Sequence, residues 1–360
     1  MSLLRFVRRL AAVARFTEWW GYKFAPIMAI CFATALLSDR PIWPLSGQLL
    51  LLLLALTVAA TYVSLLNDWT DRVVDKEAGK ENRLAQTAAS RFALLLGSCL
   101  AVGAGFLYHF WQLNPAAAFL YLGTWVVYSL YSLPPVRLKG RGVAGVLADA
   151  AGAHFFPQLL GVMVVGATMQ QPLPLLWIVG VGVWALACGL RNIIWHQLSD
   201  GANDHQAGIR TFVTVYGAAS VRRMTEWGIF PLEIAALCLL LYIEGLLLPV
   251  AALLLYAGLV LIRGLRWKMT LVIAQPGPNP HVLLNEFYEF FYPLALLLVA
   301  WWRHATDGWA GAGFLLLFGA AMWPTVRLLG GAAWRFPQQM LPANRKGACL
   351  QGPYKEEVPR

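Results

Sequence analysis

Long apolar stretches, separated by short polar or Pro- and Gly-containing segments, recur along the whole chain. Each holds about as many apolar residues as a helix needs to cross a hydrocarbon layer roughly 30 Å thick. We expect ten membrane-spanning helices, at residues 22–38, 48–66, 92–111, 116–132, 143–166, 174–196, 227–244, 247–262, 286–302 and 310–329. The stretches lack the alternation of apolar and polar residues that is typical of membrane β-barrel strands. The pattern therefore predicts an all-α fold, a polytopic transmembrane helical bundle.

The composition strengthens this prediction. Of the 360 residues, 59% are hydrophobic and only 13% are charged, and the mean hydropathy is +0.60. So many apolar residues do not fit inside one water-soluble core, which excludes a soluble enzyme with a single anchor. The five cysteines are scattered without CxxC spacing, so they predict neither a disulfide framework nor a metal site.

The formal net charge of +10 carries information about topology. If the N-terminus is cytoplasmic, the outside loops hold only Arg40 and Arg303 of the 28 Lys and Arg residues, while Arg191 lies within the sixth stretch. Positive residues collect on the cytoplasmic side of membrane proteins, so we expect a multi-pass protein of a bacterial inner membrane with this orientation. No motif supports a nucleic-acid partner; the lipid bilayer is the expected environment.

Three regions follow from this topology. Residues 1–21 combine basic and apolar positions as an amphipathic interfacial segment does. Residues 22–305 form the main membrane domain, and residues 306–360 add an extra C-terminal span and a cytoplasmic tail.

An acidic motif, D-x-x-x-D-x-x-A-G, occurs twice at a separation of 129 residues, each time after an apolar stretch. At this offset Asp71 aligns with Asp200, Asp75 with Asp204 and Asn67 with His196. Residues four apart share one face of a helix, and Asp68 falls within the same arc as Asp71. The repeat predicts two similar halves whose acidic faces meet across a central cavity.

Acidic side chains gathered at a membrane surface repel one another unless a cation lies between them. Oxygen ligands of this kind suit Mg²⁺, which prefers few carboxylates together with phosphate oxygens, so we expect a diphosphate substrate. Basic residues that could take the remaining phosphate charge lie nearby at Lys80, Arg83, Arg137, Lys139, Arg141 and Arg210. Solvated loop charges with helix-capping roles are the alternative, which the duplication of the motif disfavours.

The motifs resemble those of the UbiA superfamily of intramembrane prenyltransferases. The resemblance rests on Asn67-Asp68-x-x-Asp71-x-x-x-Asp75, on Asn82-Arg83, on the segment Tyr131–Gly142 and on Asp200-x-x-x-Asp204-x-x-x-Gly208-Ile209-Arg210-Thr211, and it covers roughly residues 20–305. It implies a bundle of usually nine spans, with an active site open to the cytoplasm, that transfers an isoprenoid from its diphosphate with Mg²⁺. The tenth span is an addition to the family pattern.

The resemblance also implies roles for individual residues. Mg²⁺ would be held by Asn67, Asp71, Asp75, Asp200 and Asp204, with Asp68 in the same catalytic group. The diphosphate would be held by Lys80, Arg83, Arg137, Lys139 and Arg210. Many members carry Asn-Asp where this chain has His196-Gln197, so the second motif has lost a carboxylate and His196 could serve the acceptor.

An allylic cation needs a dry cavity lined by aromatic ring faces. The aromatic residues nearest to the motifs are Tyr62, Trp69, Tyr128, Tyr131 and Trp195, and for each the alternative is packing. Residues that could contact the acceptor or the cation are Tyr128, Tyr131, Asp149, His154, His196 and Gln197.

Further polar residues lie inside or beside the apolar stretches. Asp149 and His154 fall within the fifth stretch, where an interhelical hydrogen bond is the alternative. Arg191 has the same two alternatives: it could reach a substrate anion or form an interhelical hydrogen bond. Glu286 and Glu289 are explained by the start of a helix, which favours acidic side chains.

The function that fits these features is Mg²⁺-dependent transfer of a prenyl chain to an aromatic or other small lipophilic acceptor. Two alternatives use the same motifs: a terpene cyclase, and phosphoribosyl transfer to a polyprenyl phosphate. A secondary transporter fits less well, because the acidic residues lie at one membrane surface and we expect no matched Pro- or Gly-broken helices in the two halves.

Overall fold

The structure, a computed structural model, describes residues 15, 19–77, 79, 81–206, 208–275 and 281–340. The expected interfacial segment 1–21 lies mostly outside these residues, as do Lys80 and the end of the tail after residue 340.

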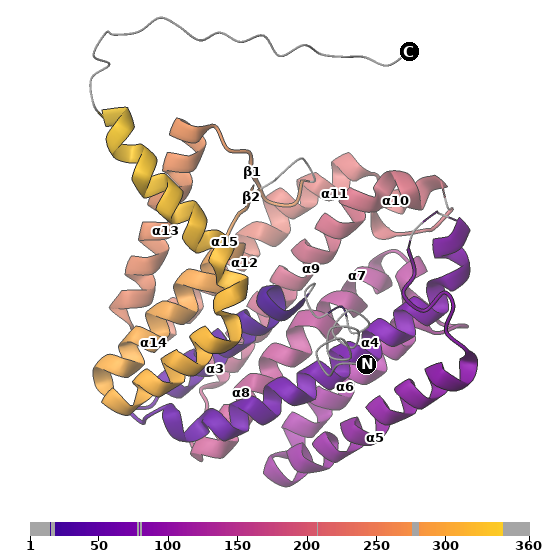
Figure 1. Cartoon of the computed structure of the whole chain (residues 1–360), viewed down its shortest axis with the longest axis horizontal. Helices are drawn as coiled ribbons and strands as arrows, with labels where there is room; N and C mark the ends of the chain where they lie inside the picture. Colours follow the sequence, from indigo (N-terminus) through magenta and orange to yellow (C-terminus); the bar gives the residue numbers. More distant parts are fainter. Residues whose placement is uncertain are drawn as a thin grey trace, which may run out of the picture. The chain divides into compact units, whose positions relative to one another are not determined.

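Helices make up almost the whole described chain, which confirms the all-α prediction (Figure 1). The helices are α3 (Ala25–Leu36), α4 (Ser46–Glu77), α5 (Ala89–Leu113), α6 (Pro115–Ser132), α7 (Val143–Ala150), α8 (Phe156–Met169), α9 (Leu175–Gln206), α10 (Phe212–Tyr216), α11 (Ala218–Met224), α12 (Phe230–Glu244), α13 (Leu247–Trp267), α14 (Tyr292–Arg303) and α15 (Gly308–Met340). Short 3₁₀ turns are η2 (Trp43–Leu45), η3 (Leu138–Gly140) and η7 (Ala305–Asp307). Two short strands, β1 (Leu271–Val272) and β2 (His281–Val282), pair in parallel.

Seven helical segments of the described chain are long and apolar enough to cross a membrane. They are Trp43–Glu77, Ala89–Leu113, Val143–Met169, Leu175–Gly201, Ala218–Glu244, Leu247–Arg266 and Ala305–Leu329. Helices also cover the other three predicted stretches, and one of these, Trp20–Leu36, is apolar but shorter. The expected count of ten spans therefore stays a prediction.

The two predicted halves are visible in the helix boundaries. Helices α4 and α9 each contain 32 residues, and α9 begins and ends 129 positions after α4 does, at the offset of the acidic motif. Gly79 and Gly208, with φ of 66° and 65°, follow these helices in the left-handed conformation that glycine adopts most easily. The glycine of the repeated motif thus ends each acidic helix.

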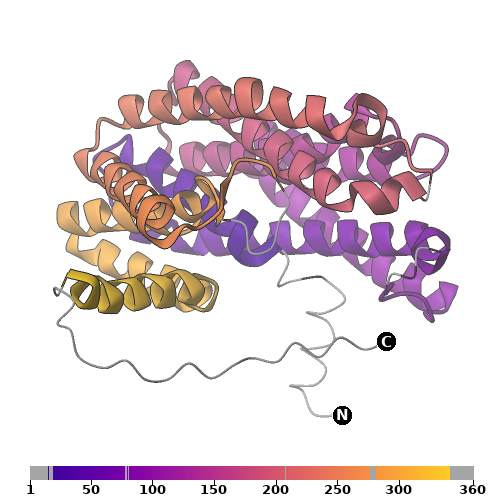
Figure 2. The same ribbon diagram turned by 90° about the horizontal axis from the view of Figure 1, so that it is seen from above.

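Helices α3 and α8, which precede α4 and α9 in the chain, lie side by side. Helix α9 packs in addition against α7 and α12, and Figure 2 shows the helices from above, running alongside one another.

Four π turns interrupt the helices in the described part of the chain, and each ends two residues before a proline. They are η1 (Trp20–Phe24), η4 (Ala151–Phe155), η5 (Thr225–Ile229) and η6 (Phe287–Phe291), followed by Pro26, Pro157, Pro231 and Pro293. Proline has no amide hydrogen, so the carbonyl four residues earlier loses its usual partner. The amide of the residue before proline reaches five residues back instead, as Phe156 does to Ala151.

The π turns η1 and η4 occupy matched positions before α3 and α8. The expectation that the two halves contain no matched interruptions was therefore wrong. Pro26 and Pro157 lie within continuous apolar stretches, and the helix continues past each proline after a single π turn. The other argument against a transporter, the clustering of acids at one surface, does not depend on this expectation.

The start of α15 belongs to the same compact unit as the preceding helices. The Trp20 ring stacks on Phe318 with centroids 5.2 Å apart, and its indole N–H donates to the Leu317 carbonyl at 2.8 Å. Buried Asp307 accepts the backbone amides of Ile42 and Trp43. This unit continues to Ala321, and a second unit begins at Met322. The expected domain boundary at residue 305 stays a prediction.

A buried ion pair links α9 to α12. Arg191 donates two hydrogen bonds to the Glu233 carboxylate, at 2.6 and 2.9 Å, and a third to Asn285 at 3.0 Å. The Tyr288 hydroxyl also donates to Glu233 at 3.0 Å. For Arg191 the sequence left two alternatives, contact with a substrate anion and an interhelical hydrogen bond. The structure shows the second, because Glu233, which is fully buried, neutralises Arg191.

Removing one member of this pair leaves a buried charge without its partner. We expect Arg191→Met to lower the free energy of unfolding by about 3–5 kcal/mol, and the double variant Arg191→Met/Glu233→Leu to recover at least half of the loss. Thermal unfolding in detergent measures both. The control is Arg222→Met, which breaks an exposed pair with Glu226 and should cost at most about 0.5 kcal/mol. An equal loss of unfolding free energy in Arg191→Met and in Arg222→Met would contradict the stabilising role of the buried Arg191–Glu233 pair.

Candidate active site

The two acidic motifs line one cavity of about 500 Å³, which we call the acidic cavity. Helix α4 contributes Asn67, Asp71 and Asp75 from successive turns of one face, and α9 contributes Asp200 and Asp204. His196 and Gln197 line the same cavity. The structure therefore brings together all five residues expected to hold metal.

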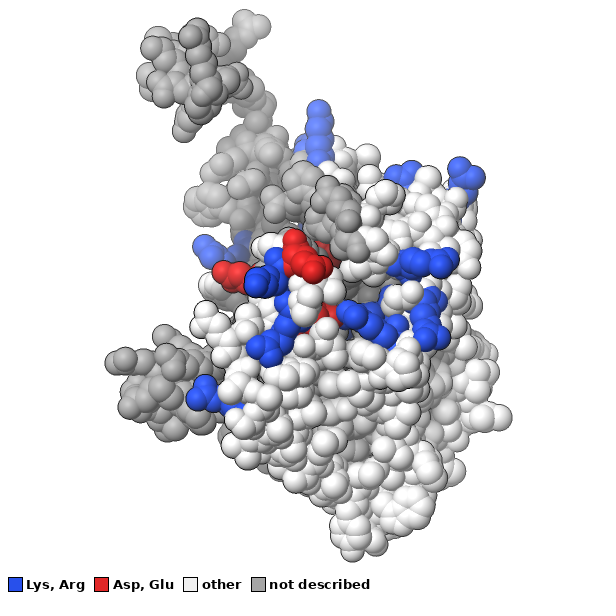
Figure 3. All heavy atoms as spheres, turned by 90° about the vertical axis from the view of Figure 1, so that its right-hand side faces the viewer, with Lys and Arg blue, Asp and Glu red and all other residues white. Residues whose placement is uncertain are grey.

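Three basic residues line the acidic cavity as well: Arg137, Lys139 and Arg210. Asp71 accepts a hydrogen bond from Lys139 and another from Arg137, the latter at 3.1 Å. Burial lowers the pKa of the Lys139 ammonium below its usual 10.5, and the neighbouring Asp71 carboxylate opposes this shift. Figure 3 shows Lys and Arg side chains gathered around acidic ones on one face of the molecule.

The donor set of the acidic cavity fits a metal that arrives with a phosphate ligand. Among the described residues, no three His, Cys, Asp or Glu side chains converge closely enough to hold a metal by themselves. Mg²⁺ commonly binds through one or two carboxylates and completes its coordination with phosphate oxygens and water. Carboxylates and cations on one cavity wall therefore suit a metal–diphosphate better than a bare ion.

Asp68 has a different environment from the other motif residues. Its side chain is 1% exposed and forms an ion pair with Arg15, and it does not line the acidic cavity. Asn82 donates to the Asp68 carbonyl and to the Asp75 carboxylate, both at 2.7 Å. Asp68 and Asn82 thus fix the end of α4 and orient Asp75.

The remaining diphosphate candidates lie elsewhere. Arg83 is exposed and does not line the acidic cavity. Lys80 lies outside the described part of the chain.

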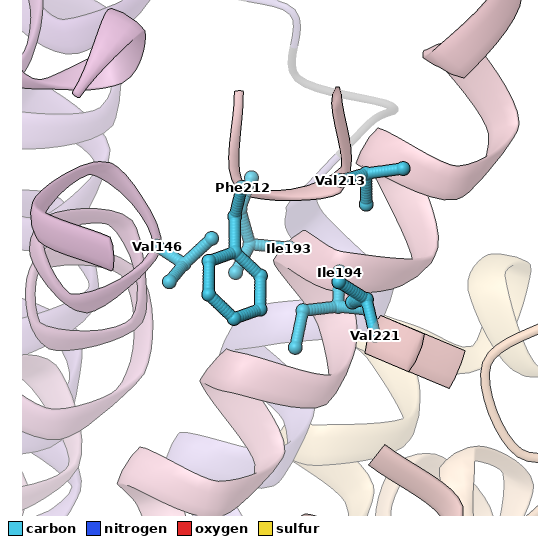
Figure 4. Close-up of a cluster of buried hydrophobic side chains, with 6 residues drawn as sticks. All are labelled: Val146, Ile193, Ile194, Phe212, Val213 and Val221. Atoms are coloured by element: carbon cyan, nitrogen blue, oxygen red, sulfur yellow. The ribbon is translucent and has the colours of Figure 1, made fainter. Parts of the chain in front are cut away.

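A hydrophobic cluster behind the acidic cavity holds α9 in place (Figure 4). Its members are Val146 of α7, Ile193 and Ile194 of α9, Phe212 and Val213 of α10 and Val221 of α11. Gln197 accepts the backbone amide of Val213 at 3.3 Å. Gln197 therefore also has a structural role, which ties α10 to the acidic end of α9.

A second cavity of about 390 Å³ adjoins the acidic one, and we call it the apolar cavity. Its walls include Phe24, Ile27, Leu56, Ala59, Val63 and Pro157. Tyr128, Tyr131 and Asp149 also line it, and the Tyr128 hydroxyl lies 3.5 Å from an Asp149 oxygen. Asn67, Tyr131 and Asp200 line both cavities, so a ligand could extend from the acids into apolar surroundings.

Tyr62 and Trp69 do not line these cavities. The Tyr62 ring lies 4.5 Å from the Trp125 ring, and its hydroxyl is 2.7 Å from that of Ser129. Trp69 stacks on Phe92 at 4.0 Å. Both rings therefore have packing partners: Trp125 for Tyr62, and Phe92 together with the Arg72 guanidinium, 4.3 Å from the ring centroid, for Trp69.

A third cavity of about 630 Å³ lies beside α9, and most of its wall is apolar. We call it the polar chamber after the ionisable side chains Lys23, Arg191 and Glu289 in its wall. Three π turns line it: η1 through Lys23, η4 through His154 and η6 through Glu289. Trp195 lines it as well, and His196 lines all three cavities. π turns frequently occur at functional sites because they turn side chains inward.

Two residues of the polar chamber were not recognised as such in the sequence. Lys23 received no role, although a lysine within an apolar stretch is a sign of a functional site. Glu289 lies in the first turn of its helix, as predicted, and in addition it lines the chamber. Its neighbour Glu286 pairs with Arg263.

Comparisons with known proteins agree with this architecture. The model of the UbiA prenyltransferase family matches residues 27–272. A UbiA homolog from Archaeoglobus fulgidus, solved bound to GPP and Mg²⁺, aligns with a TM-score of 0.56 at 17% identity over 83% of this chain and 99% of its own. Its structure bound to DMAPP and Mg²⁺ aligns with a TM-score of 0.55 at 16% identity over 81% and 99%. At these identities the likeness is one of fold. No curated protein sequence matches the chain.

The charge of Lys139 should contribute directly to anion binding. We expect Lys139→Gln to weaken binding of inorganic diphosphate, in the presence of Mg²⁺, by about tenfold or more, as for other charge-assisted hydrogen bonds. Lys139→Arg should retain most of the affinity. Isothermal titration measures both, and the exposed Lys268→Gln is the control. Unchanged affinity in Lys139→Gln would contradict this role.

Proposed function

Because this chain belongs to the UbiA prenyltransferase family, we propose that it transfers a prenyl chain from a prenyl diphosphate to an aromatic or other small lipophilic acceptor, with Mg²⁺ as cofactor. The observation that carries the proposal is the acidic cavity, where carboxylates of α4 and α9 and three cations surround one space beside the apolar cavity. The related archaeal structures described as bound to GPP or DMAPP with Mg²⁺ support the choice of ligand and metal.

The acidic cavity would hold the diphosphate. Asn67, Asp71, Asp75, Asp200 and Asp204 would hold Mg²⁺, which when bound stabilises the negative charge of the departing diphosphate. Arg137, Lys139 and Arg210 would bind its phosphate oxygens. Asp71 pairs with Lys139 and Arg137, so these cations would exchange one anionic partner for another when they bind the diphosphate.

The apolar cavity would hold the hydrocarbon chain and keep water away from the reacting carbon. Tyr131 lies where the acidic and apolar cavities meet, and Tyr128 lies deeper in the apolar cavity. Their ring faces would stabilise positive charge on the allylic carbon without reacting with it. Asp149, next to Tyr128, adds a compensating acidic group on the same wall.

The reaction balances as a substitution at the allylic carbon. The carbon–oxygen bond breaks and its electron pair leaves with the diphosphate, while an electron pair of the acceptor forms the new bond. The acceptor then loses one proton. We assign its removal to the His196 imidazole, because His196 lines all three cavities; His154 and Gln197 contribute to the wall around it.

The third cavity leaves room beside His196 for a second substrate, which favours transfer to an acceptor over cyclisation. The acidic residues at one mouth, on the side rich in Lys and Arg, favour a site that faces the cytoplasm. We propose a bacterial inner membrane as the location.

The test is prenyl transfer by the purified protein in lipid nanodiscs with radiolabelled geranylgeranyl diphosphate and Mg²⁺, with and without a panel of aromatic acids and quinols. We expect acceptor-dependent release of diphosphate, and about a hundredfold or greater loss of rate in Asp71→Asn and Asp200→Asn, as when other electrostatic catalysts are removed. Asp39→Asn, at an 85% exposed position, is the control.

Other outcomes of the same assay identify the alternatives. Release with a hydrocarbon product and no acceptor would indicate a cyclase. No release from the prenyl diphosphate, but phosphoribosylation of a polyprenyl phosphate, would replace the proposal with phosphoribosyl transfer.

A further inference from the structure

A fourth cavity of about 440 Å³, which we call the arginine pocket, adjoins the acidic cavity. Arg141 and Val143 line it from the start of α7, and Arg210, Val215 and Tyr216 line it from the segment that contains α10. Arg210 lines the acidic cavity as well, whereas Arg141 does not. The function proposed above therefore leaves Arg141 without a role.

The two walls of the arginine pocket are joined by direct contacts. The Gly142 amide donates a hydrogen bond to the Arg210 carbonyl at 3.3 Å. The Tyr216 ring lies 4.9 Å from the Phe212 ring, measured between centroids. Phe212 belongs to the hydrophobic cluster that also contains Val146 of α7 (Figure 4). The pocket is therefore built into the fold, because backbone and core contacts hold its walls together.

The arginine pocket carries two positive charges, and no acidic side chain of the described chain lines it. Arg141 donates one hydrogen bond, to the Pro135 carbonyl at 2.8 Å, and its other N–H groups have no partner among the described residues. Arg210 forms no ion pair with another described residue. Two guanidinium groups at one pocket favour an anion between them, and their paired N–H donors match the oxygens of a phosphate.

The position of the arginine pocket along the helices indicates where this phosphate comes from. One segment long and apolar enough to cross a membrane, Val143–Met169, begins at the pocket. Another, Ala218–Glu244, begins two residues after Tyr216. The starts of two such segments lie at the level of the lipid headgroups, where tyrosine is also enriched. The two arginines are therefore placed at headgroup level.

Apolar side chains continue from the arginines toward the expected bilayer. Val143 and Leu147, one turn apart on α7, are both exposed, and so are Val215 and Tyr216. Residues four apart share a helix face, so Val143 and Leu147 form an apolar strip that leads away from Arg141. A phosphate with an attached hydrocarbon chain would contact both the arginines and this strip, whereas a free phosphate would contact only the arginines.

We propose that the arginine pocket binds the phosphate headgroup of an anionic membrane lipid, with the phosphate between Arg141 and Arg210 and an acyl chain along Val143 and Leu147. The inference goes beyond the proposed prenyl transfer and does not depend on it. Because Arg210 lines both cavities, the bound headgroup would lie directly beside the acidic cavity.

The experiment compares two lipids that differ in the net charge of the headgroup. Native mass spectrometry of the full-length protein in detergent measures the dissociation constants of phosphatidylglycerol and phosphatidylcholine with the same acyl chains. We expect the first phosphatidylglycerol to bind about tenfold or more tightly than the first phosphatidylcholine, because each arginine near a membrane surface strengthens binding of an anionic lipid by about fivefold. Equal affinities in the wild type would overturn the proposal.

Variants assign the preference to the pocket. Arg141→Gln should weaken binding of phosphatidylglycerol by about fivefold and leave phosphatidylcholine unchanged, while Arg141→Lys should retain most of the affinity. The matched control is Arg223→Gln, which removes the same charge from an exposed position of α11 outside the pocket. If Arg141→Gln and Arg223→Gln have equal effects, the lipid responds only to net charge, and the proposal fails.

A second pair of variants leaves the hydrogen bond between Arg141 and Pro135 intact. Val215 is exposed, so Val215→Asp adds an anion at the pocket without burying it. It should weaken binding of phosphatidylglycerol, whereas the neutral Val215→Asn should not. Unchanged affinity in Val215→Asp, or an equal loss in both variants, would contradict a phosphate at this position.

A competition experiment separates a lipid headgroup from a free phosphate. Inorganic phosphate, in molar excess over the lipid and without Mg²⁺, is added to the complex with phosphatidylglycerol. We expect the lipid to stay bound, because its acyl chain makes apolar contacts that inorganic phosphate lacks. Displacement of the lipid from the wild type would identify the pocket as a site for soluble phosphate, and the lipid assignment would be wrong.

Discussion

The structure depends on the balance between the carboxylates that line the acidic cavity and the cations placed among them. Like charges at a partly buried site repel one another strongly, because the effective dielectric constant there is well below that of water. The chain brings Asp71 and Asp75 toward Asp200 and Asp204 nonetheless, and places Arg137, Lys139 and Arg210 among them. Such a cavity is stable only when cations accompany the acids, and it is therefore prepared for a metal–diphosphate.

The rest of the fold places some charged side chains at the cavities and pairs others inside the protein. Two helices of equal length, each ended by a left-handed glycine, carry the acids to the same mouth. Proline-linked π turns direct Lys23, His154 and Glu289 into the polar chamber. Charges that serve packing, such as Arg191 with Glu233 and Arg263 with Glu286, are neutralised inside the protein. Charged side chains that line the cavities can instead interact with ligands.

The helices and the acidic faces could be predicted from the sequence because both depend on local periodicity and on a repeated spacing. The partners of individual side chains could not, since they come from distant parts of the chain. Asp68 shares the helix arc of Asp71, yet Arg15, 53 residues away, pairs with it. Arg191 is neutralised by Glu233, 42 residues away. Trp69 stacks on Phe92 of the next helix and does not line the cavity. Lys23 could have been identified from its place in an apolar stretch.

The most direct test of this account is a crystal or cryo-EM structure of the protein with a prenyl thiolodiphosphate and Mn²⁺, with the metal located by anomalous scattering or by its density. The account predicts metal between the acidic faces of α4 and α9, diphosphate oxygens against Arg137, Lys139 and Arg210, and the hydrocarbon chain in the apolar cavity. Metal and diphosphate bound away from Asp71 and Asp200, or a hydrocarbon chain lying in the polar chamber, would contradict it.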